Sequence, residues 1–132
     1  MAAPGVENFE NEDALDWVSE LERAKSSSFI AETLRVVTER GDEYLDANEA
    51  SRALAAAEVV AALNHAASPR LPVEVKQWVS RHQVGSPSLT QLALKSIQRI
   101  ETASELSEMW DESERADEWY EVLENLESRL GK

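Results

Sequence analysis

The chain has 132 residues and no cysteine, and its 26 acidic residues outnumber its 13 lysines and arginines, which gives a formal net charge of −13. The lack of cysteine excludes disulfide bonds, thiolate nucleophiles and thiolate metal sites, and it favours a cytoplasmic location. The negative charge argues against direct binding of nucleic acid or of an anionic membrane, because both rely on lysine and arginine to neutralise phosphate.

The composition predicts a helical protein. Apolar residues make up 42% of the sequence, glycine and proline number only four each, and the abundant alanine, glutamate and leucine favour helix over strand. No segment approaches the roughly 20 apolar residues needed to span a bilayer. The start of the chain lacks the basic and apolar regions of a signal peptide. We therefore expect an all-α, compact single domain over residues 1–132, built as a bundle of about six helices.

Residues 1–10 are expected to form an irregular N-terminal arm, after which the first helix begins. Asn11 is a favourable N-cap, and two acids follow it where the helix dipole favours negative charge. The apolar residues of this helix recur at helical spacing: Ala14, Trp17, Val18 and Leu21. We expect the helix to end near residue 25. Three serines at residues 26–28 offer the start of a second helix, which Gly41 would stop.

The third predicted helix, at about residues 47–66, is the least polar part of the chain. Asp46 and Glu49 have the spacing of a capping box at its start. Between residues 53 and 63 the only charged side chain is that of Glu58. Because a helix that is apolar nearly all round is usually buried, we expect this helix to lie at the centre of the fold.

Proline and serine mark the boundaries of the remaining helices. Pro72 suits the first turn of a short fourth helix, and Ser86 followed by Pro87 suits the start of a fifth. The apolar pattern of the fifth helix continues past Ser104, which is either the N-cap of a further helix or an interior residue. The last helix is expected at about residues 114–130. The count is therefore six helices, or seven if the chain breaks at Ser104.

Several segments resemble a bacterial domain-of-unknown-function family. The segment from Phe9 to Trp17 is similar to the family's Phe-(Glu/Asp)-Asn-Asp-x-Ala-x-Asp-Trp, and the likeness extends through the alanine-rich residues 53–63 to pieces within residues 104–119. The chain departs from the family at its start, where Pro4 and a glycine replace Trp-Gly. The resemblance implies a small cytoplasmic bacterial protein, and it implies no activity, cofactor or catalytic residue.

The acidic C-terminal third is the strongest candidate for a functional surface. Eleven acids and a single base lie between residues 101 and 128, and like charges one helical turn apart destabilise a helix by roughly 0.2–0.5 kcal/mol per pair. The pattern serves either solubility or a negative surface that steers a basic protein partner. We expect binding in the manner of an immunity or antitoxin protein that covers a toxin's nucleic-acid-binding face, with a partly exposed tryptophan as the anchor. The predicted partner-binding residues are Trp110, Asp111, Glu112, Glu114, Asp117, Glu118 and Glu121.

An alternative function is that of a small enzyme or a divalent-metal-binding protein. Asp13, Asp16 and Glu20 are spaced so that their carboxylates line one strip of the first helix, and carboxylate oxygens suit hard cations. The same acids are also explained as a solvated face that complements the helix N-terminus. Glu58 would complete such a site if it were a general base in a pocket. Its structural explanations are an exposed edge position, or burial with a hydrogen-bonding partner.

The sequence predicts no catalytic residue, cofactor or metal ligand outright. It contains no Glu-x-x-His pair, EF-hand loop, nucleophile elbow or glycine-rich phosphate loop. The two histidines, His65 and His82, are expected to be structural. An enzyme is therefore the weaker hypothesis. A third hypothesis is a homodimer that buries one helix face, and it requires an exposed apolar stripe on the monomer.

Overall fold

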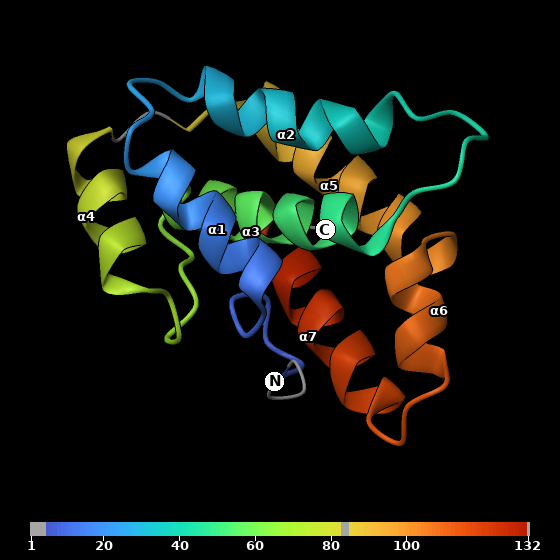
Figure 1. The fold of residues 1–132 in the computed structure, drawn as a ribbon. Helices are drawn as coiled ribbons and strands as arrows, with labels where there is room; N and C mark the ends of the chain where they lie inside the picture. The colour runs from blue at the N-terminus through green and yellow to red at the C-terminus, as the bar shows by residue number, and fades with distance from the viewer. Residues whose placement is uncertain (1–4, 83–84, 132) are drawn as a thin grey trace.

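The computed structural model describes residues 5–82 and 85–131, which form seven helices and no strand (Figure 1). The all-α prediction is confirmed, and the number of helices is seven instead of six. The first four residues of the predicted N-terminal arm lie outside the described residues. The helices are α1 (Glu12–Leu21), α2 (Ser28–Thr38), α3 (Ala47–Leu63), α4 (Val73–Arg81), α5 (Pro87–Thr102), α6 (Glu105–Asp111) and α7 (Ala116–Arg129).

The seventh helix exists because the chain breaks at Ser104. The Ser104 hydroxyl accepts the Ser107 N–H at 3.0 Å, and the Ser107 hydroxyl accepts the Ser104 N–H at 3.3 Å. This reciprocal arrangement is a capping box with serine in the place of glutamate. Ser104 is therefore the N-cap of α6, and the alternative of one helix running through it is wrong.

Side-chain N-caps start three of the helices as predicted. Asn11 begins α1 with a 2.8 Å bond, Asp46 begins α3 with a 2.8 Å bond, and Ser86 begins α5 with a 3.2 Å bond, each to the N–H three residues further on. The predicted capping box of α3 is only half formed, because the Glu49 side chain pairs with Arg40 instead. Local capping chemistry thus places most of the helix starts.

α3 ends at Leu63, earlier than the predicted residue 66. His65 adopts a left-handed φ of +65°, and the Ala66 N–H bonds back to the Ala61 carbonyl at 2.8 Å. This geometry is a Schellman-type termination, which is usually built on glycine. α1 also ends four residues before its predicted end, and α7 begins two residues later than predicted.

α3 lies at the centre of the molecule and contacts each of the other six helices (Figure 1). Every residue from Ala53 to Leu63 is buried, including Glu58, whose burial the sequence left open. α2, α3 and α5 pack against one another, while α4 and α6 lie at opposite sides of the view. The small alanine side chains allow this close packing, since they leave room for a neighbouring helix on every side of α3.

Residues 5–10 precede α1 as an irregular segment that packs on the core. Val6 and Asn8 are 8% and 4% exposed. The Gly5 N–H bonds to the Glu10 carbonyl at 3.0 Å, which closes the segment as a loop. Residues 5–10 therefore belong to the folded body.

None of the described helices combines the length and the apolar character required to cross a membrane.

Candidate functional site

Glu58 is buried in the middle of α3 and forms an ion pair with α7. Its side chain is 3% exposed. Arg129 donates from Nη1 to Glu58 Oε1 at 2.9 Å and from Nη2 to Oε2 at 3.1 Å. Asn8 donates from Nδ2 to Glu58 Oε2 at 2.8 Å. Of the explanations open for Glu58, burial with a hydrogen-bonding partner is confirmed, and both oxygens have a charge-assisted bond.

The Arg129 guanidinium joins three parts of the chain. Besides Glu58, it contacts the carbonyl of Ala66, just after α3, at 3.1 Å and the side-chain oxygen of Asn125 at 2.7 Å. Its side chain is 17% exposed. Through Glu58 it also reaches Asn8 in the segment before α1. This cluster of Asn8, Glu58 and Arg129 therefore ties the N-terminal segment, α3 and α7 together.

The first-helix acids have other partners and do not meet Glu58. The carboxylate of Asp13 accepts a bond from Asn48 at 2.7 Å, Glu20 pairs with Arg52 at 2.8 Å, and Asp16 is exposed. Across residues 5–82 and 85–131, no group of three or more histidine or acidic side chains is placed to hold a metal ion. The hypothesis that Glu58 and these three acids form one site is therefore wrong.

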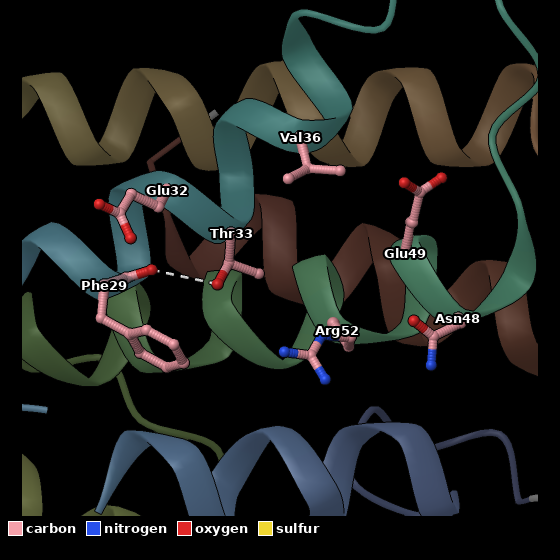
Figure 2. A pocket seen from close by; sticks show the side chains of 7 residues that line it. All are labelled: Phe29, Glu32, Thr33, Val36, Asn48, Glu49 and Arg52. Atoms are coloured by element: carbon pink, nitrogen blue, oxygen red, sulfur yellow. Dashed lines mark hydrogen bonds between the residues drawn. The ribbon is translucent and has the colours of Figure 1, made fainter. Parts of the chain in front are cut away.

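A groove of about 270 Å³ lies between α2 and α3 (Figure 2). Most of its polar side chains already bind protein partners: the Thr33 hydroxyl donates to the Phe29 carbonyl at 3.1 Å and accepts the Trp17 indole N–H at 2.8 Å. Arg52 and Glu49 are engaged in ion pairs with residues outside the groove. Nothing in the groove therefore selects a particular ligand.

The acids predicted to bind a partner lie on one stretch of α6, the following turn and α7. All of them are exposed, and so is one more acid on α6. Arg115, the single base in this stretch, pairs with Glu118 at 2.6 Å. We call this surface the acidic face, and it consists of Glu108, Asp111, Glu112, Glu114, Asp117, Glu118 and Glu121.

The tryptophans of this region are buried between α6 and α7. Trp110 is 9% exposed and Trp119 is 2% exposed. Their rings are stacked, with centroids 6.3 Å apart and an interplanar angle of 15°. The expectation of a partly exposed indole is therefore wrong, because stacking on Trp119 draws Trp110 into the interface between the two helices.

Other side chains beside the acidic face are exposed. Tyr44 and Met109 are 61% and 51% exposed. Desolvation, followed by the negative charges of Glu108 and Glu105, raises the pKa of Tyr44, which places this ring next to the α6 acids. The acidic face is thus bordered by a tyrosine and a methionine, which are residue types enriched at protein interfaces.

Residues 2–122 match a protein family described as a domain of unknown function, DUF4259. The chain belongs to the DUF4259 family. The match confirms the resemblance to a domain-of-unknown-function family. No curated protein and no solved structure matches the chain. The DUF4259 match includes Asn8, Glu58 and the whole acidic face, whereas Arg129 lies beyond it.

Sequence reasoning missed two members of the buried cluster in this DUF4259 protein. Asn8 gave no signal, because it stands in an irregular segment without a helical pattern. Arg129 stood out only as one of the few bases in an acidic region. A buried Glu58 requires a cation or several donors nearby, so a search for its partner is the one route that would have reached Arg129.

Proposed function

We propose that this DUF4259 protein binds a basic protein through the acidic face. The observation that carries the proposal is that every predicted acid of this surface is exposed. Arg115 is the only base that lies among these acids and offsets their charge. Such a surface attracts a basic partner over distances of about 10 Å at moderate salt and orients it before contact. The binding mode would be that of an immunity or antitoxin protein, acting in the cytoplasm.

Tyr44 and Met109 are the proposed anchors of the contact. Both project from the protein beside the acids, and both offer more accessible area than Trp110. Interfaces draw most of their binding energy from a few aromatic or large apolar side chains, while the surrounding charges set orientation and association rate. The proposed interface therefore combines electrostatic steering by the acidic face with contacts from Tyr44 and Met109 at its border.

Two charge-reversal variants, one at the acidic face and one at α1, distinguish specific binding by the acidic face from a general effect of net charge. One variant carries Glu112→Lys, Asp117→Lys and Glu121→Lys on the acidic face, and the matched control carries reversals on α1. Both variants change the net charge equally and alter one acid in a first helical turn. The control substitutions are Glu12→Lys, Asp16→Lys and Glu22→Lys.

Tagged protein and both variants are compared by affinity capture from host lysate at low and high salt, with quantitative mass spectrometry. We expect the native protein and the α1 control to retain the same basic protein at low salt and to release it at high salt. The acidic-face variant should lose it at both. Equal loss from both variants, or no salt-sensitive partner at all, would leave solubility as the role of the acids.

A further inference from the structure

Arg99 on α5 bonds to the backbone of the loop between α2 and α3. Its guanidinium donates from Nη1 to the Gly41 carbonyl at 2.6 Å and from Nη2 to the Glu43 carbonyl at 2.7 Å. Its Nε donates at 2.9 Å to the carbonyl of Ala103, the C-cap of α5. The bond to Ala103 serves the end of α5, whereas the two bonds to the loop add nothing to that helix. Because a guanidinium is planar and presents its donors in a fixed fork, Arg99 holds the two loop carbonyls in one relative orientation.

The end of the same loop is bonded to the start of α6. Leu45 is 0% exposed, and its carbonyl accepts the Glu105 N–H at 2.9 Å. Glu105 Oε1 in turn accepts the Ala47 N–H at 2.7 Å. These reciprocal bonds fix the loop against the helix that carries Glu108 and Met109.

Tyr44 lies between the two anchored peptide groups. The Glu43 carbonyl before it is held by Arg99, and the Leu45 carbonyl after it is held by Glu105. The Tyr44 side chain itself is 61% exposed. An exposed aromatic ring on an immobilised backbone is preorganised for binding, because a contact with it costs less conformational entropy. The bonds on both sides of Tyr44 therefore fix the place where its ring leaves the surface.

We propose that Arg99 is a positioning residue of the partner-binding surface and holds Tyr44 in one place at the border of the acidic face. This inference rests on the proposed function, since the contact of Tyr44 is with the basic partner. A guanidinium of that partner stacks on the exposed ring, where the carboxylates of α6 also attract it. Arg99 acts through Tyr44 and not by its own contact with the partner.

The effect of Arg99 on the loop is measured by backbone ¹⁵N relaxation of the whole protein. We expect Arg99→Met to lower the heteronuclear NOE of residues 42–45, which reports faster local motion, and to leave the helices unchanged. Arg99→Lys keeps the charge but lacks the fork of donors, so it should show the same change to a smaller extent. The matched control is Lys95→Met, an exposed position one turn earlier on α5. A loop that is equally rigid in Arg99→Met and Lys95→Met overturns the proposal.

The role in binding is measured by calorimetric titration with an oligoarginine peptide at low salt. Tyr44→Ala and Arg99→Met should each weaken binding by about two- to fivefold, and the double variant should bind no more weakly than Tyr44→Ala alone. Loss of a positive charge by itself strengthens binding of a cationic peptide, so Lys95→Met should bind equally well or more tightly. Arg99→Met that binds as tightly as Lys95→Met, or a further loss in the double variant, overturns the proposal.

The two proposals fail in different measurements. Equal binding of the peptide by the acidic-face variant and the α1 control would contradict the proposed function, whereas the relaxation data would still show whether Arg99 fixes the loop. Weaker binding by the acidic-face variant alone, together with a rigid loop in Arg99→Met, would retain the acidic face and remove Arg99 from its mechanism.

Discussion

The buried carboxylate of Glu58 depends on partners from two other parts of the chain. A carboxylate that is 3% exposed is stabilised by Arg129 on both oxygens and by Asn8 on one. Removing one partner of a buried pair is costly because the remaining charge stays desolvated. The three residues come from segments separated by 50 and 71 positions in the sequence, so their interaction contributes to tertiary packing and not to any single helix.

Glu58→Gln should lower the free energy of unfolding by about 3 kcal/mol, because it leaves the Arg129 charge without its counter-ion. Urea unfolding followed by circular dichroism measures this change. Glu118→Gln is the matched control, since its pair with Arg115 is more than half exposed on both sides, and it should cost much less stability than Glu58→Gln. Equal effects of the two substitutions would mean that the buried Glu58 pair contributes no more to the free energy of unfolding than the exposed Glu118 pair.

Tyr120 provides a pH-dependent contribution. Burial of the phenol, followed by its 2.9 Å hydrogen bond to Asp111 and the charge of that carboxylate, raises the pKa of Tyr120 to about 12. An unfolded tyrosine ionises near its ordinary pKa of 10.0. The folded state therefore retains the proton longer, so the contribution to stability is fully present below pH 10 and is lost as the pH rises through the folded pKa.

The Tyr44→Phe variant leaves Tyr120 as the sole tyrosine, since the chain has two. Phenolate absorbance should then titrate with a midpoint near the Tyr120 pKa of about 12, and Asp111→Asn should move that midpoint down by removing the charge. A midpoint at the ordinary tyrosine pKa in the folded protein would show that Tyr120 is solvated and not bonded to Asp111.

At the scale of the element, most helix starts follow from residues next to them. Asn11, Asp46 and Ser86 cap their helices through bonds to the N–H three residues further on, and such contacts are readable from sequence. The helix ends were predicted less well. α3 ends just before His65, which has a left-handed φ. Glycine usually occupies this position at a helix end, and its absence here left the end unmarked in the sequence.

His65→Gly should raise the free energy of unfolding by about 0.5–1 kcal/mol, because glycine adopts a positive φ without the steric cost of a side chain. The His65 side chain is exposed, so little packing is lost. His82→Gly is the control with the opposite expected sign: His82 has a φ of −130° and stacks on Trp78 with ring centroids 4.0 Å apart. Thermal unfolding compares the two, and a loss of stability in His65→Gly would reveal a stabilising role for that imidazole.

The whole molecule consists of a packed core around α3 and a strongly acidic surface. Among the residues that the structure describes, the exposed large apolar side chains lie on different elements and form no stripe along one helix. They are Leu15, Val36, Tyr44, Val73 and Met109. The acids, in contrast, gather on α6 and α7, where Tyr44 and Met109 are their apolar neighbours. This distribution favours a partner guided by charge over a homodimer that buries one helix face.

The candidate sites were only partly predictable. The acidic face was found because charge runs are a property of the sequence, and the surface exposure of Asp117, Glu118 and Glu121 on α7 follows from its periodicity. The tryptophan expected to project from it does not, because Trp110 stacks on Trp119 of the next helix. The cluster of Asn8, Glu58 and Arg129 could not be found, since it joins an irregular segment to α3 and α7.

The sequence by itself determined the helical class, the N-caps and the burial of α3, because hydrogen bonds and apolar periodicity act over a few residues. The sequence left open whether Ser104 begins a new helix, and the Ser104–Ser107 bonds that start this helix are local. Tertiary structure alone decided that Glu105, the first acid of that helix, accepts the Ala47 N–H at 2.7 Å. It also decided that Glu58 pairs with Arg129 instead of joining the acids of α1. These outcomes depend on which helix faces are in contact, and those contacts are set by packing between segments distant in the chain.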